Sequence, residues 1–269
     1  MHSVEWAQPA PPVIALNQTS LNGRPVADGD LRALALVNYG HFTSMQVRDG
    51  KVRGMALHLA RLDDGNEKFF GHRGDVEDEL RLRELIRHAL GDVRDASVRV
   101  TLVPEVLVAV SDPVPDDPAP PWRVRTDPYE RPWPEQKHSA TLGPRLTARS
   151  AREQGYDDAL LVGPDGLVRE GTFWNVAFWD GTQVVFPEAP MLKGVTMVLL
   201  QIAMTMTGVP WALRPVRRTD LPDLLAAAAV STLCAAQPIA SIDDVVFEEQ
   251  DKLTAALLSA WATVPWDEI

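Results

Sequence analysis

A proline-rich segment near the middle of the chain, residues 111–121, most limits how this sequence can fold. It reads SDPVPDDPAPP, and its prolines lack the backbone N–H that a helix interior or a sheet ladder requires. We therefore predict a linker over residues 112–121. It divides the 269-residue chain into an N-terminal α/β domain, residues 1–111, and a C-terminal domain, residues 122–269. Both parts are long enough to bury apolar cores.

Expected strands and helices are interleaved in both parts without a regular strand–helix–strand rhythm. Turn signals such as RDGK at 48–51 and PDG at 164–166 separate strands, and glycines follow several of the amphipathic stretches. The pattern predicts an α+β fold rather than a doubly wound sheet. Strands are expected at 13–16, 42–47, 98–103, 106–110, 159–162, around 168, at 175–179 and 184–186, and helices at 56–70, 77–90, 145–154, 195–207 and 253–263.

Composition disfavours several functional classes. A net charge of −11 disfavours binding to nucleic acid or to anionic membranes. One cysteine, Cys234, permits neither an intrachain disulfide nor a cysteine metal cluster, and the six histidines show no metal-ligand spacing, so we expect no metal. No apolar stretch reaches membrane-spanning length, and residues 1–12 lack the pattern of a signal peptide. We expect a soluble, cytoplasmic protein.

Lysine is scarce, which narrows the search for a lysine that forms a covalent bond to a cofactor. The chain has 26 basic residues other than histidine, and five of them are lysines. Local context does not choose among the five: Lys51, Lys68, Lys137, Lys193 and Lys252.

Four scattered features match what a phosphorylated pyridine aldehyde needs besides a lysine. Such a cofactor needs an acid at the ring nitrogen, and an arginine and helix N-terminal amides for its phosphate. Taken alone, each feature also has an ordinary structural interpretation, as a turn glycine, a solvated carboxylate, a salt-bridged arginine or a junction between elements. The candidates are Gly194-Val195-Thr196 at the start of an expected helix, Glu170 in a strand hairpin, Arg61 in an expected helix, and Ser231-Thr232 after an apolar run.

These pieces occur in the order and spacing of the class IV aminotransferases, the pyridoxal-phosphate enzymes of fold type IV, which the sequence resembles from about residue 21 to its C-terminus. That family includes branched-chain and D-amino acid aminotransferases, (R)-selective amine transaminases and aminodeoxychorismate lyase. The FTS segment and the Lys-His pair resemble the lyase branch, whereas LKGVT resembles the D-amino acid branch. The matching blocks lie at 42–62, at 137–138 with 157–160, at 165–175, at 192–196 and at 231–243.

The resemblance implies a small N-terminal α/β domain, a larger C-terminal pseudo-barrel domain, and a homodimer whose active sites lie between the domains. It also implies that pyridoxal 5′-phosphate forms a Schiff base with Lys137 and that Glu170 pairs with the pyridine nitrogen. The activity implied is transamination, from an amino acid or primary amine to a keto acid. Residues implied to hold the phosphate are Arg61, Val195, Thr196 and Thr232, with Gly194 and Ser231 beside them.

The chain departs from the family where substrates bind. Pro104-Glu105 stands where many members carry arginines for a substrate carboxylate, Thr141 or Leu142 replaces a tyrosine, and Met197 replaces an arginine. A glutamate repels a carboxylate, so the departures favour a primary amine or an apolar amino acid as donor. We expect the substrate pocket to include Tyr39, His41 and Phe42.

Two alternatives to transamination remain open at this point. One is a lyase of the aminodeoxychorismate type, which releases pyruvate and needs no amino acceptor. The other is a protein that binds the cofactor with little catalytic activity.

Overall fold

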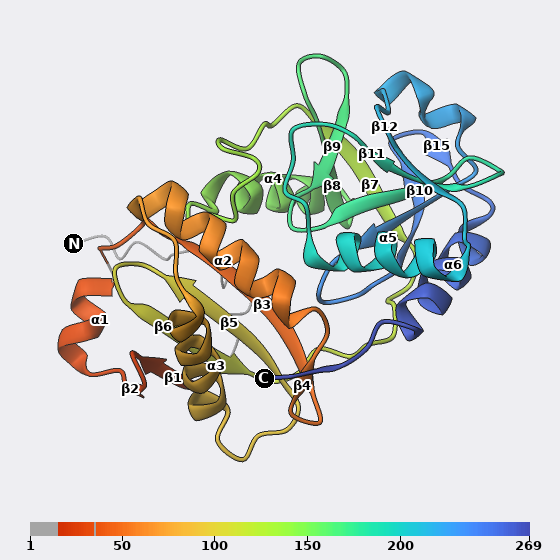
Figure 1. The fold of residues 1–269 in the computed structure, drawn as a ribbon. Helices are drawn as coiled ribbons and strands as arrows, with labels where there is room; N and C mark the ends of the chain where they lie inside the picture. The colour runs from red at the N-terminus through yellow and green to blue at the C-terminus, as the bar shows by residue number, and fades with distance from the viewer. Residues whose placement is uncertain (1–15, 35) are drawn as a thin grey trace, which may run out of the picture.

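The computed structural model describes residues 16–34 and 36–269, which form two β-sheets with helices packed against them (Figure 1). The first sheet is antiparallel throughout, and its core lies beneath α2 (Met55–Phe70) and α3 (Val76–Leu90). A short helix, α1 (Asp28–Leu34), follows its edge hairpin. In spatial order its strands are β16 (Asp267–Glu268), β4 (Lys51–Val52), β3 (His41–Arg48), β5 (Ala96–Leu102), β6 (Val106–Ser111), β1 (Leu16–Leu21) and β2 (Arg24–Pro25).

The second sheet is mixed and curls into a half-barrel. One apolar cluster fills its inner side, and a second lies beneath α5 (Val195–Thr207) and α6 (Gln250–Ala262). A third helix packed on this sheet, α4 (Leu142–Glu153), contacts β7 and β8. The strands run β12 (Trp211–Arg214), β11 (Val184–Pro187), β10 (Asn175–Trp179), β13 (Ala226–Val230), β14 (Gln237–Ile242), β7 (Trp122–Asp127), β8 (Asp158–Val162) and β9 (Val168–Gly171), with β15 (Val245–Val246) beside β14.

The predicted α+β architecture is confirmed, and the five expected helices are found with ends shifted by at most three residues. The expected strand at 13–16 falls almost wholly outside the described residues. Strands β7, β12, β13 and β14 were among those not predicted from the sequence. Pro238 interrupts the pattern of β14, and β7 follows directly on the prolines of the linker. No helix in the described part of the chain is both long and apolar enough to cross a membrane.

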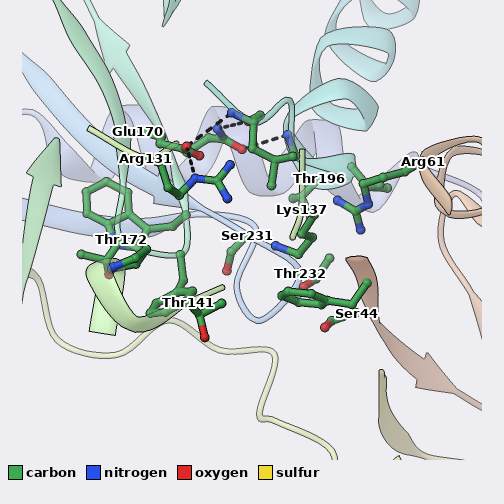
Figure 2. Close-up of a pocket in the computed structure, with 18 of the residues that line it drawn as sticks. Ser44, Arg61, Arg131, Lys137, Thr141, Glu170, Thr172, Thr196, Ser231 and Thr232 are labelled. Carbon is green, nitrogen blue, oxygen red and sulfur yellow. Dashed lines mark hydrogen bonds and ion pairs between the residues drawn. The ribbon is translucent and has the colours of Figure 1, made fainter. Parts of the chain in front are cut away.

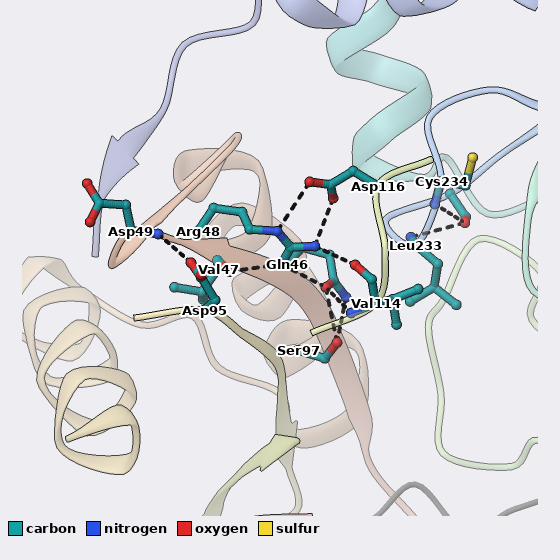
Figure 3. Close-up of polar contacts among 11 residues, drawn as sticks. Gln46, Val47, Arg48, Asp49, Asp95, Ser97, Val114, Asp116, Leu233 and Cys234 are labelled. Carbon is teal, nitrogen blue, oxygen red and sulfur yellow. Dashed lines mark hydrogen bonds and ion pairs between the residues drawn. The ribbon is translucent and has the colours of Figure 1, made fainter. Parts of the chain in front are cut away.

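The proline-rich segment between β6 and β7 is held against both sheets. Figure 3 shows its contacts with β3 of the first sheet. Arg48 on β3 forms an ion pair with Asp116 at 2.8 Å and also donates to the Val114 carbonyl at 2.5 Å. Gln46, on the same strand, accepts from the Val114 amide at 3.2 Å. At the other end, Gln237 on β14 bonds the backbone of residues 119 and 120. The segment is therefore a fixed connection between the sheets.

A second connection between the sheets places Lys137. The segment 137–139 pairs with the start of β3: the Phe42 amide donates to the Lys137 carbonyl at 2.9 Å, and the Ser139 amide donates to the Gly40 carbonyl at 2.9 Å. Gly40 has φ +155°, and a Cβ at this position would lie 2.4 Å from the carbonyl oxygen of Leu102. Only glycine fits this crossing without a backbone shift.

Replacing Gly40 by alanine is expected to lower the free energy of unfolding by about 1–3 kcal/mol, because the new methyl group clashes with backbone. Urea unfolding of Gly40→Ala beside Gly29→Ala measures this. Gly29 is the control because it lies in α1, where a Cβ meets nothing within 4 Å. Equal unfolding midpoints for the two variants would contradict the constraint at Gly40.

Candidate active site

A pocket lies where the two sheets meet, and Figure 2 shows its charged side chains converging from both sides. The first sheet contributes β3 and helix α2. The second contributes the end of β9, the start of α5 and the loop after β13, and the segment before α4 crosses between them. All of the expected cofactor residues line this pocket together with one expected substrate residue: Phe42, Arg61, Lys137, Glu170, Gly194, Val195, Thr196, Ser231 and Thr232.

Of the three residues expected in the substrate pocket, Tyr39 and His41 are not part of this lining. Successive side chains on a strand point to opposite faces, so His41 turns away when Phe42 faces the pocket. His41 instead packs over α2, within 3.1 Å of the Asn66 side-chain oxygen. The Tyr39 hydroxyl donates to the Phe69 carbonyl at 2.8 Å, and its ring stacks edge-on against Phe69.

The start of α5, which we call the cradle, presents hydrogen-bond donors that suit an anion. The first-turn amides of any helix lack an intrahelical acceptor, and in α5 no side-chain cap supplies one. The backbone at Gly194 lies close to the Asn175 side chain. A Cβ on Gly194 would lie 2.3 Å from Oδ1 of Asn175, and the same oxygen accepts from the Gly194 amide at 3.1 Å. The Thr196 hydroxyl is buried without a hydrogen-bond partner among the described residues. A bound anion would satisfy these groups.

Arg61 enters the pocket from α2 and brings a buried positive charge. One guanidinium nitrogen donates to the Thr43 hydroxyl, whose oxygen lies 2.7 Å from Nδ1 of His58. Burial lowers the pKa of His58 well below its usual value, with Arg61 and Lys137 adding to the shift, so His58 is neutral. Burial also lowers the pKa of Arg61 to about 10, which leaves it charged at neutral pH. The Arg61 Nε has no partner among the described residues.

Lys137 is held in a positively charged, dehydrated setting. Burial above all, with the neighbouring Arg61 and Arg131 adding to the shift and Glu170 opposing it, lowers its pKa to about 7. The Nζ lies 5.0 Å from the centre of the Phe42 ring. A substantial share of this amine is therefore neutral and nucleophilic at physiological pH.

Glu170 is paired with an arginine that the sequence offered no reason to select. Arg131 lies in the irregular segment before Lys137, and its Nε donates to Oε1 of Glu170 at 3.2 Å. Arg131 also donates to the carbonyls of Gln136, at 3.1 Å, and Pro134. Burial raises the pKa of Glu170 and the adjacent Arg131 guanidinium opposes that shift. The Leu192 amide donates to the same Oε1 at 3.4 Å, while Oε2 has no bond to the described residues.

A tight turn after Glu170 forms one wall of the pocket, and Asp158 holds it. The buried Asp158 carboxylate accepts from the Thr172 hydroxyl at 2.7 Å and from the indole of Trp174 at 3.1 Å. The indole covers Gly171, where a Cβ would meet the ring at 1.9 Å. Three residues of the wall, 172–174, are thereby fixed relative to Glu170. The sequence block containing Asp158 could be recognised, but its role as the anchor of this wall could not.

Two further arginines flank the pocket beyond Lys137. The Arg99 guanidinium lies 3.6 Å from the centre of the Phe42 ring, and that of Arg145 lies 5.7 Å from the Phe173 ring. Their mutual repulsion and, above all, the burial of Arg99 lower the pKa of Arg99 to about 10. Neither forms an ion pair with a carboxylate of the described residues. Their charges are available to an anionic group entering the pocket.

Comparison with known proteins agrees with this arrangement. The family model of class IV amino-transferases matches residues 40–242. No curated protein sequence matches the chain. Among solved structures, the branched-chain amino acid aminotransferase of Escherichia coli superposes with a TM-score of 0.76 at 18% identity, over 92% of this chain and 94% of that one.

Two other solved structures share the fold. A hypothetical aminotransferase from Mycobacterium tuberculosis, in a form with pyridoxal phosphate bound, gives a TM-score of 0.75 at 19% identity, over 91% of this chain and 98% of that one. A protein from Legionella pneumophila, provisionally named a 4-amino-4-deoxychorismate lyase, gives a TM-score of 0.72 at 18% identity, over 87% of this chain and 94% of that one. The fold type IV architecture expected from the sequence is thus confirmed. Because the family model spans well over half of its length, the chain belongs to the class IV aminotransferase family.

Proposed function

We propose that this chain is a transaminase that binds pyridoxal 5′-phosphate and holds it through a Schiff base on Lys137. One observation carries the proposal. Of the five lysines, all of which lie in the described residues, only Lys137 lines the pocket that also contains Arg61 and Glu170. Its low pKa supplies the neutral amine that imine formation needs.

The residues present fit the phosphate of this cofactor. The unpartnered Thr196 hydroxyl and Arg61 Nε are buried donors that require an acceptor, and the free amides at the start of α5 favour a negative charge. Gly194, Val195 and Thr196 all line the pocket, so this helix end faces it. Arg61, Val195, Thr196 and Thr232 would hold the phosphate, with Ser231 beside them.

Bound pyridoxal phosphate supplies an electron-withdrawing ring that takes up the electron pair released when a substrate carbon loses its proton. Lys137 would carry that proton, because its amine lies in the same pocket as the groups proposed to hold the cofactor. A pKa of about 7 allows this amine both to accept and to return a proton near neutral pH.

Glu170 is the acid that would keep the ring nitrogen protonated. Arg131 occupies Oε1 and favours the ionised carboxylate, which leaves Oε2 to face a cationic donor. Asp158 fixes the turn after Glu170 and so holds this wall of the site in place. These contacts orient the acid before any ligand enters.

Arg99 and Arg145 refine the expectation about substrates. The sequence lacks the usual carboxylate-binding arginines after β5, which favours an uncharged donor. The keto acid acceptor still carries a carboxylate, and the two arginines beside Phe42 and Phe173 supply positive charge for it. A primary amine or an apolar amino acid as donor, with a keto acid as acceptor, fits both observations.

A lyase activity is the second candidate, supported by the Phe42-Thr43-Ser44 and Lys137-His138 segments, parts of which line the pocket.

A homodimer is part of the proposal as well. Exposed apolar side chains beside the pocket, Leu142 and Leu146 on α4 and Phe173 on the wall, favour coverage by a second copy.

Lys137→Ala is expected to abolish both turnover and the near-visible absorbance of the attached cofactor, because no other lysine lines the pocket. Lys193→Ala is the matched control, since Lys193 lies next to the cradle but outside the lining and should leave the spectrum intact. A retained absorbance band in the Lys137 variant would refute the proposed attachment.

Lys137→Met is expected to stabilise the cofactor-free protein most at pH 7 and below. The unfolded chain holds the lysine proton up to a pKa near 10.5, whereas the folded protein releases it at about 7. The free energy of unfolding of the wild type should therefore rise relative to that of the variant as the pH rises between these values, by at most about 1.4 kcal/mol per pH unit. Denaturant unfolding from pH 6 to 10 measures the gap, with Lys68→Met as the exposed control. A gap that does not change with pH would contradict the low pKa.

Transamination and lyase activity are separated by their need for an acceptor. The holoenzyme is expected to transfer an amino group from one or more of a panel of (R)- and (S)-amines and D- and L-amino acids to pyruvate. A lyase would instead release pyruvate from aminodeoxychorismate with no acceptor present. Absence of both activities with the cofactor bound would leave a binding protein and refute the transaminase proposal.

A further inference from the structure

The last residues of the chain leave the second sheet and return to the first (Figure 1). Strand β16 pairs antiparallel with β4, and the Ile269 side chain is buried in the core of the first sheet. Glu268 forms an ion pair with Lys51 at 2.7 Å, and its carbonyl accepts from Arg83 on α3 at 2.9 Å. The C-terminal segment, residues 264–269, is thus attached to the domain that carries α2.

One of these contacts caps the helix that carries Arg61. Helix α2 has neither a capping side chain at Gly54 nor an acidic residue in its first turn. Asp267 takes that role from 212 positions away: its Oδ2 accepts from the Met55 amide at 2.8 Å. A carboxylate at a helix N-terminus also stabilises the helix through its dipole.

The same region adjoins the proposed phosphate cradle. The turn before α2 packs on α5, because a Cβ on Gly54 would lie 2.7 Å from Leu199. The guanidinium of Arg53 lies between two indoles of the C-terminal part, 4.7 Å from the Trp261 ring centre and 4.5 Å from that of Trp266.

A cavity behind the cradle is lined both by residues of the cradle and by residues of the C-terminal segment. Its lining includes His58 from α2, Thr196 from the cradle and Trp266 from the C-terminal segment. Arg61 follows Met55 by six residues, about 9 Å along the helix. A shift or fraying of the first turn of α2 would therefore move Arg61 relative to Thr196.

We propose that Asp267 is a positioning residue for the cofactor phosphate: by capping α2 it holds Arg61 in register with the start of α5. The inference rests on the proposed function, in which Arg61 binds that phosphate. A purely structural tail would support the fold as a whole. The cap instead acts at the one helix end that leads to Arg61, so its loss should weaken phosphate recognition selectively.

The test compares pyridoxal phosphate with pyridoxal, which lacks the phosphate, as ligands of the cofactor-free full-length protein. The ratio of the pyridoxal dissociation constant to the pyridoxal phosphate dissociation constant reports the phosphate contribution alone. Asp267→Ala is expected to reduce this ratio by at most about fivefold, because the effect on phosphate binding cannot exceed the stabilisation that the cap gives to the helix. Asp267→Asn keeps a hydrogen-bond acceptor and should restore most of it, which also keeps the test available if the alanine variant does not fold. Glu268→Gln is the control on the same strand and should leave the ratio unchanged.

Arg61→Gln separates failure of this inference from failure of the proposed function. Arg61→Gln alone should reduce the ratio, and adding Asp267→Ala to it should cause no further loss, because the two act through one contact. An unchanged ratio in Asp267→Ala, with a reduced ratio in Arg61→Gln, would overturn the positioning role alone. An unchanged ratio in Arg61→Gln would overturn the phosphate site itself. Equal weakening of both ligands in Asp267→Ala would show a general structural role and also overturn the inference.

Discussion

The backbone pairing of residues 137–139 with the start of β3 is the contact on which the site depends. Two hydrogen bonds, Phe42 amide to Lys137 carbonyl and Ser139 amide to Gly40 carbonyl, tie the segment before α4 to the first sheet. Lys137 thereby lies at the junction of the sheets, facing groups from each. Because the contact is made by backbone, it places the lysine without using its side chain, which is left for the chemistry.

Electrostatics follow from this placement. Among the described lining residues, Arg61, Arg131 and Lys137 face a single carboxylate, Glu170. Burying several cations near one another is costly, and the low pKa of Lys137 is one consequence. A phosphate at the α5 end would offset part of that cost, while Arg131 is already paired with Glu170. The pocket is thus electrostatically divided, with an anion-binding side and a side where the acid is held.

The resemblance to class IV aminotransferases, rather than any local signal, selected the expected site residues, because each block taken alone also had an ordinary structural interpretation. The spacing of Lys137 to the blocks at 157–160 and 165–175, matched to that family, distinguished it from the other four lysines. Nine of the residues expected in the site line the pocket. Arg131 was missed because its irregular segment has no periodic pattern and its partner, Glu170, lies far along the chain on β9. His41 does not line the pocket with Phe42 because neighbouring residues on a strand face opposite sides, and the sequence alone does not say which side meets the pocket. Asp267 caps a helix from the far end of the chain, so no local pattern could predict it.

The central claim is that Lys137 carries the cofactor, and reduction by borohydride tests it most directly. Reduction converts a Schiff base into a stable secondary amine, so the modified lysine can be identified by peptide mass spectrometry after digestion of the wild-type protein. The account predicts the added mass of the reduced cofactor on the peptide containing Lys137. Modification of Lys193 or another lysine instead, or of none, would contradict it.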